Sequence, residues 1–224
     1  MESALLFLIF TCAAVEWLAV SKGWRKVEYL AKPGVMVLLL GWLALAGGLS
    51  GALTWFGTGI LLSMAGDIFL LLPNERRWFL FGLGAFLLAH LAYTLGLNMP
   101  PAPLTPLVLG LALFVGISVL PLIRRILLGL REKGLRRLVE PVRYYATAIT
   151  LMLFSALATL FRSDWRNTPA YLVSLGAALF AISDAVLAWD KFVTPVRRGR
   201  LIVMVTYHLG QLLLAMGAVE QFGK

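Results

Sequence analysis

Long apolar runs, separated by short polar connections, recur along the whole chain. Eight of them have the length, roughly 20 residues, that crosses the hydrocarbon core of a bilayer as an α-helix. Together they leave almost no room for a soluble domain. We therefore predict an all-α, polytopic integral membrane protein in which residues 1–224 form a single transmembrane domain. The predicted helices lie near 3–20, 31–49, 53–72, 78–97, 104–122, 141–161, 168–189 and 200–219.

The composition agrees with this pattern. Apolar residues make up 60% of the chain and charged residues only 14%, whereas soluble domains average about 45–50% and about 25%. The formal net charge of +9 could suggest a nucleic-acid partner. We expect none, because the positions of the basic residues are explained by membrane topology and by contact with anionic lipid head groups.

The basic residues alternate between the connections as a membrane topology requires. Of the 20 lysines and arginines, 17 lie in or beside the odd-numbered connections. The other three are Arg162, Arg166 and Lys224. Because cytoplasmic loops carry the excess of positive charge, the sequence predicts that both termini lie outside. Cys12 is the only cysteine, so we expect neither an intramolecular disulfide nor a cysteine-based metal site.

The longest polar connection runs from 123 to 140 and is both basic and rich in leucine. Two interpretations remain open for it. The leucines favour an amphipathic helix that lies on the membrane surface. The charges alone are typical of a solvated linker.

Ionisable residues inside the predicted spans are the main functional signal, because such groups are costly in hydrocarbon. Asp67 is followed in the next span by His90, and Asp184 is followed in the next span by His208, at a separation only one position longer. The two units are four helices apart and run in the same direction. This spacing predicts a parallel repeat of four plus four helices.

The depths of these residues indicate a site near one membrane face. Each aspartate is five residues from the cytoplasmic end of its predicted helix, so both should lie roughly 7 to 8 Å below that surface. Lys32 opens a helix at the same face, whereas His90 and His208 should lie deeper. We therefore expect a polar funnel that is open to the cytoplasmic leaflet.

Further polar residues share faces with the histidines. Tyr93 falls on the same helical stripe as His90, and Gln211 on the same stripe as His208, with Tyr207 beside it. Three other interpretations of these groups remain open. They could staple the bundle by hydrogen bonds, two aspartates and two histidines could bind a metal ion, or the carboxylates could serve a proton-coupled transporter of a small molecule or lipid.

The order and helical placement of several short motifs resemble the YhhN/TMEM86 family of membrane proteins. The likeness extends from the second predicted helix to the eighth, and the first and fifth match least. The residues that carry it are Ala31, Lys32, Pro33, Met36, Gly66, Asp67, Leu70, Phe79, Gly82, Leu83, Phe86, His90, Tyr93, Ser183, Asp184, Leu187, Ala188, Phe192, Tyr207 and Gln211.

The resemblance implies a lysoplasmalogenase, which cleaves the vinyl ether bond of 1-alkenyl lysophospholipids to release a fatty aldehyde and glycerophosphoethanolamine or glycerophosphocholine. This hydrolysis needs an acid and a base but no covalent nucleophile, no cofactor and no metal. We predict Asp67 and Asp184 as the catalytic pair. Lys32, His90, Tyr93, Tyr207, His208 and Gln211 are the predicted substrate-binding or supporting residues. The expected partners are the lysophospholipid and membrane lipids, and the expected location is a bacterial cytoplasmic membrane, with the site open to the cytoplasm.

Overall fold

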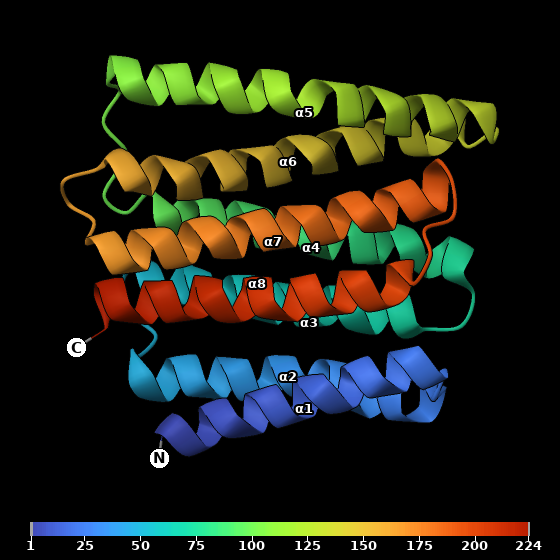
Figure 1. Ribbon diagram of the computed structural model, residues 1–224, viewed down its shortest axis with the longest axis horizontal. Helices are drawn as coiled ribbons and strands as arrows, with labels where there is room; N and C mark the ends of the chain where they lie inside the picture. Colours follow the sequence, from blue (N-terminus) through green and yellow to red (C-terminus); the bar gives the residue numbers. More distant parts are fainter. Residues whose placement is uncertain (1, 224) are drawn as a thin grey trace.

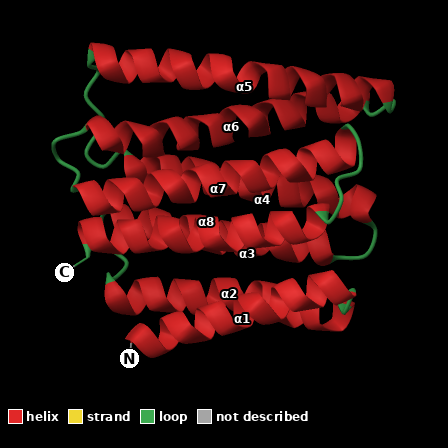
Figure 2. Ribbon diagram, in the orientation of Figure 1, coloured by secondary structure: helices red, strands yellow, loops and turns green. Residues whose placement is uncertain are grey.

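The computed structural model describes residues 2–223 and is a bundle of long helices that lie side by side (Figure 1). No strand is present among these residues (Figure 2). Eight helices within the same range are long and apolar enough to cross a membrane, which confirms the predicted all-α class. Lys224 lies outside the described residues. The helices are α1 (Glu2–Lys22), α2 (Arg25–Ala46), α3 (Ala52–Leu71), α4 (Glu75–Leu97), α5 (Pro106–Glu132), α6 (Val139–Ala158), α7 (Asn167–Phe192) and α8 (Gly199–Phe222).

The helices are arranged around a centre made of α3, α4, α7 and α8. Helices α1 and α2 cover one edge of this centre, while α6 and then α5 form the other (Figure 1). Small residues allow the close approach of α7 and α8: a Cβ added at Gly176 would lie 2.9 Å from the carbonyl oxygen of Gly210. Gly59 occupies the corresponding place on α3, where a Cβ would meet the ring of Tyr93. Both glycines precede an aspartate by the same separation, and the parallel repeat itself stays a prediction.

The connection 123–140 follows neither of the two expectations. Helix α5 continues through it to Glu132, and the chain re-enters helix at a short 3-10 turn, Arg136–Leu138. Ile126 and Leu130 are buried in a cluster with Phe79 and Phe192. Ile126 and Leu130 thus pack this part of α5 against the bundle, and the burial of their apolar side chains stabilises the contact.

Helix α2 begins earlier than the predicted residue 31, at Arg25. Its first turns carry charged side chains that the apolar pattern had assigned to a connection. Glu28 is one of them, yet it is buried and accepts a hydrogen bond from Arg200 of α8 at 2.5 Å. The first turns of α2 therefore belong to the packed bundle.

A buried arginine ties together two connections at the opposite end of the bundle. Arg162 donates hydrogen bonds to the carbonyl oxygens of Leu97, at 3.1 Å, and Pro100, at 2.6 Å. It also forms an ion pair of 2.7 Å with Asp164. The hydrogen bond from this guanidinium lowers the pKa of the Asp164 carboxyl below its ordinary value.

We expect Asp164→Asn to lower the free energy of unfolding at pH 7 by up to about 1 kcal/mol, because the Asp164 side chain is partly exposed. The lowered pKa means that the ion pair stabilises the fold above the ordinary aspartate pKa of about 3.9, and that this contribution is lost as the pH falls through the lower, folded-state value. Unfolding in detergent, compared at pH 7 and pH 3, should show a larger deficit relative to the native protein at pH 7 than at pH 3. Glu220→Gln is the control, and an equal deficit at both pH values would contradict the ion-pair explanation.

Candidate active site

Asp67 is bound by side chains from two neighbouring helices. It lies on α3 with 1% of its side chain exposed. Its Oδ1 forms an ion pair with Lys32 Nζ of α2 at a distance of 2.9 Å. The Tyr207 hydroxyl of α8 donates to Oδ2 at 2.7 Å. Gly66, the preceding residue, makes room for the ring of Phe86, since a Cβ there would lie 2.6 Å from it. Both carboxylate oxygens are therefore bound, and the buried charge is balanced by Lys32.

Asp184 is held in a different way. It lies on α7, and its Oδ2 accepts a hydrogen bond of 2.5 Å from the Tyr145 hydroxyl of α6. His90 Nε2 of α4 is 3.2 Å from the same oxygen and 3.1 Å from the tyrosine hydroxyl. The side chain of Asp184 is 13% exposed. Its partners are thus a phenol and an imidazole, in contrast to the ammonium group that faces Asp67.

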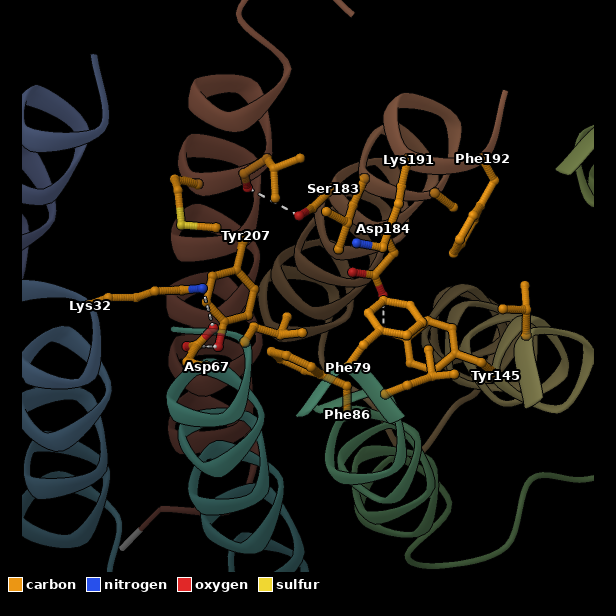
Figure 3. A pocket seen from close by; sticks show the side chains of 17 residues that line it. Lys32, Asp67, Phe79, Phe86, Tyr145, Ser183, Asp184, Lys191, Phe192 and Tyr207 are labelled. Carbon is orange, nitrogen blue, oxygen red and sulfur yellow. Dashed lines mark hydrogen bonds and ion pairs between the residues drawn. The ribbon is translucent and has the colours of Figure 1, made fainter. Parts of the chain in front are cut away.

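The two aspartates line one cleft, which we call the site cleft. Figure 3 shows Asp67 with Lys32 and Tyr207 on one side of it, and Asp184 with Tyr145 on the other, with Phe79 and Phe86 between them. Most of its wall is apolar. Besides these residues it is lined by Leu70, Leu83, Val142, Ser183, Leu187, Ala188, Lys191, Phe192, Val203 and Met204.

Four of the six predicted supporting residues, Tyr93, Gln211, His208 and His90, do not line the site cleft. Tyr93 is buried and donates to Gln211 Oε1 in the core between α4 and α8. His208 accepts a hydrogen bond of 3.1 Å from Trp17 Nε1 of α1. Lys32 and Tyr207 do line the cleft, and His90 reaches it through Asp184.

The contacts cross between the two halves of the chain. His90 follows Asp67 in the sequence but lies against Asp184. Tyr207 follows Asp184 at the same separation but lies against Asp67. The residue at the matching position in the second half is therefore Tyr207, and His208 is one position beyond it. Each aspartate is therefore contacted by a side chain from the last helix of the opposite half, α4 or α8.

Tyr145 is the site residue that the sequence pattern did not single out. A signal for it was available, because it lies four residues inside the predicted span 141–161, almost the depth at which the aspartates lie in theirs. A tyrosine at a span end is usually explained by the membrane interface, where its hydroxyl meets water. Here the hydroxyl points inward and binds Asp184.

A metal site made from the two aspartates and two histidines has no geometric support. Within residues 2–223, no three side chains of His, Cys, Asp or Glu come together in a way that could hold a metal ion. The two histidines bind different partners, Asp184 and Trp17. The arrangement instead offers two carboxyl groups in unlike surroundings on an apolar cleft.

Comparison with known proteins gives concordant results. The model of the YhhN family matches residues 27–218. Lysoplasmalogenase TMEM86B of Mus musculus is 34% identical over 209 residues, which cover 92% of this chain and 81% of the relative. The human protein of that name is 33% identical over 203 residues, 88% of this chain and 80% of the relative.

A bacterial relative also matches. Lysoplasmalogenase of Mycobacterium bovis is 28% identical over 182 residues, which cover 81% of this chain and 67% of the relative. No solved structure matches the chain. The family match covers α2 to α8 almost completely and includes both aspartates, Lys32, Tyr145 and Tyr207. The chain belongs to the YhhN family.

Proposed function

We propose that this integral membrane protein is a lysoplasmalogenase, which hydrolyses the vinyl ether bond of a 1-alkenyl lysophospholipid to a fatty aldehyde and a glycerophospho-alcohol. The single observation that carries the proposal is the site cleft, where two carboxyl groups with unlike partners lie on an apolar wall. The names of the relatives support the same activity. The predicted topology would open the cleft to the cytoplasmic leaflet.

The unlike surroundings divide the roles of the two carboxyl groups. Asp67 has a cation 2.9 Å away, so it is the group that carries negative charge at least cost. The partners of Asp184 are a phenol and an imidazole, those of Tyr145 and His90. Two carboxyl groups whose environments differ in this way can act as base and acid in one reaction. We assign Asp184 as the acid and Asp67 as the base.

The reaction then follows in three proton-balanced steps. Asp184 gives its proton to the β-carbon of the vinyl ether, and the carbon attached to oxygen becomes an oxocarbenium ion. Water adds to that carbon while Asp67 takes one of its protons, which gives a hemiacetal. The hemiacetal collapses as Asp67 returns this proton to the glycerol oxygen and the hemiacetal hydroxyl gives its own to Asp184. Both carboxyl groups are restored, and the aldehyde leaves.

A second, apolar groove continues from the site cleft between α5, α6 and α7. The two share Val142, Tyr145, Asp184 and Ala188. The rest of the groove is lined by Val119, Leu122, Ile123, Ile126, Ala146, Ile149, Thr150, Leu153, Ala181 and Ala185. The groove is lined by Asp184 and by residues of α5, the helix at one edge of the bundle (Figure 1), and we therefore assign it to the alkenyl chain.

Filling this groove should change chain-length preference. We expect Ala146→Phe to lower kcat/KM for a substrate with an 18-carbon alkenyl chain by about tenfold or more, and to affect a chain of about 10 carbons much less. The reason is that each CH₂ denied an apolar site loses about 0.8 kcal/mol. Ala14→Phe, on the exposed face of α1, is the matched control. Equal losses for both chain lengths would place the alkenyl chain elsewhere.

The interior of the bundle argues against a transporter. Aromatic rings pack beyond the aspartates, with Phe86, Phe180 and Tyr207 in mutual edge contacts at 5.2 to 6.3 Å between centroids. Tyr93 and Gln211 close the next layer by their hydrogen bond. This packing supports a cleft that ends inside the protein.

The direct test is aldehyde release by the purified protein. Folded protein in detergent, given lysoplasmalogen, should yield aldehyde and glycerophospho-alcohol in equal amounts. The same lipid with a saturated ether, which has no double bond to accept a proton at the β-carbon, should yield neither. A folded preparation that releases no aldehyde would refute the proposed function. Uptake of a labelled lysophospholipid into vesicles without hydrolysis would favour the transporter instead.

A further inference from the structure

A charged cavity adjoins the site cleft at the end of the bundle where α1 ends and α8 begins. We call it the vestibule; its volume is about 360 Å³, far more than the 10 to 15 Å³ that a single water molecule requires. Lys32, Phe79 and Lys191 line both spaces, so the two are direct neighbours. Its charged lining consists of Glu16, Glu28, Lys32, Asp190, Lys191 and Arg200.

Two carboxylates in the vestibule retain unused acceptor atoms. Glu16 and Glu28 are both buried, with 1% and 3% of their surface exposed. Arg200 donates to Glu28 Oε2, but Glu28 Oε1 and Glu16 Oε2 accept no hydrogen bond from any described residue. Buried acceptors without a donor are rare and costly, more so when they are charged. The catalytic steps proposed above use neither residue.

Asp190, the third acidic residue, has a structural partner in the backbone. Its Oδ1 accepts a hydrogen bond of 2.6 Å from the backbone nitrogen of Val196 and so holds the connection between α7 and α8. Of the three acidic residues, Glu16 and Glu28 are the ones with a buried oxygen that accepts no hydrogen bond from the described residues. Lys191 and Arg200 add positive charge to the lining of the same cavity. The vestibule thus presents both signs of charge, as a zwitterionic ligand requires.

We propose that the vestibule binds the head group of the substrate and selects phosphoethanolamine, with Glu16 and Glu28 as ligands of its ammonium group. The inference rests on the proposed function, because it places the glycerol and vinyl ether in the site cleft. A primary ammonium group carries three N–H donors, so it can satisfy Glu16 Oε2 and Glu28 Oε1 together. The trimethylammonium of choline has no N–H to donate and is bulkier. The phosphate lies on the side of Lys191 and Arg200.

A comparison of three substrates with one alkenyl chain tests the selection. Aldehyde release is measured for the phosphoethanolamine, phosphocholine and amine-free phosphate forms. We expect kcat/KM to be highest for phosphoethanolamine, and about tenfold lower for the amine-free lipid, since it lacks charge-assisted hydrogen bonds to two carboxylates. Equal values for the three lipids, or a preference for choline, would overturn the proposal.

Glu16→Gln removes the negative charge but keeps the shape of the side chain. It therefore separates the effect of the carboxylate on binding from its effect on folding. We expect it to lower kcat/KM for phosphoethanolamine about tenfold and to leave the amine-free lipid almost unchanged, so that the preference disappears. Glu132→Gln is the matched control, since Glu132 is exposed at the same end of the bundle and lies outside the vestibule. An equal loss for all three lipids in a folded Glu16→Gln protein would show a structural role and contradict the assignment.

Binding of unreactive analogues separates this inference from the proposed function. Lysophospholipids with a saturated ether have the same head groups and no bond that this chemistry can cleave. The native protein should bind the ethanolamine analogue more tightly than the amine-free one, and Glu16→Gln should abolish the difference. Head-group-dependent binding without aldehyde release from any vinyl ether would refute the hydrolase and retain the vestibule as a lipid site. Aldehyde release without any head-group dependence would refute the vestibule as the head-group site and retain the hydrolase.

Discussion

Replacing Asp184 by asparagine should lower kcat for aldehyde release by about a thousandfold, within the range of 10² to 10⁴ for loss of a positioned general acid. An amide has the size and hydrogen-bonding capacity of the carboxyl group but no proton that it can give to the β-carbon. The partners of Asp184, Tyr145 and His90, hold its Oδ2 in place and can also hold an amide. KM should therefore change little, and the loss should lie in kcat.

The measurement follows NADH consumption by an added alcohol dehydrogenase that reduces the released aldehyde. Asp164→Asn is the matched control, because it makes the same chemical change at the opposite end of the bundle. Binding of the saturated ether analogue shows whether the Asp184→Asn site is still formed. Retention of more than about a tenth of the native kcat would remove Asp184 from the role of acid. A loss of binding together with activity would show that the residue is structural.

Replacing Lys32 by methionine should destabilise the protein by about 3 to 5 kcal/mol, because it leaves a buried carboxylate without its counter-charge. Asp67 is 1% exposed, and Lys32 Nζ lies 2.9 Å from its Oδ1. The remaining partner, the Tyr207 hydroxyl, donates a hydrogen bond but carries no charge. Activity should fall as well, because the proposed base would lose the cation that keeps it ionised. Unfolding in detergent and aldehyde release measure the two effects separately.

The double variant Lys32→Met with Asp67→Asn distinguishes the two roles of the pair. Removing both charges leaves no isolated ion in the bundle, so most of the lost stability should return. Activity should not return, because an amide cannot take a proton from water. If the double variant stays as unstable as Lys32→Met alone, the ion pair is not the source of the destabilisation. If it regains activity, Asp67 is not the base.

The sequence by itself determined the class of the protein and the elements of the site. Eight apolar runs of spanning length leave the backbone only one way to satisfy its hydrogen bonds in hydrocarbon, which is the α-helix. The rarity of ionisable groups inside those runs marked Asp67 and Asp184, and counting residues from the helix ends placed them at one depth. Both inferences depend on local properties of a segment, namely its length, its hydropathy and the rise per residue.

The tertiary structure decided which side chains meet. Spacing along the chain coupled Asp67 with His90 and Asp184 with His208, but packing places Tyr207 on Asp67 and His90 on Asp184. Rotation of a helix about its axis and the choice of its neighbours depend on contacts between distant segments, and hydropathy does not record them. Tyr145 became a site residue for the same reason, because α6 turns its hydroxyl toward α7.

The same distinction applies to the ends of the helices. From the charged residues, the sequence predicted a connection at 123–140 and a start of α2 near residue 31. In the structure, Ile126 and Leu130 of α5 and Glu28 of α2 are buried in the bundle. A charged or leucine-rich turn at the membrane edge can face water, lipid or protein, and only the neighbouring helices settle which. Segment length and hydropathy thus determined the helices and predicted a common depth for the aspartates, while helix packing decided their partners, the cleft between them and the vestibule beside it.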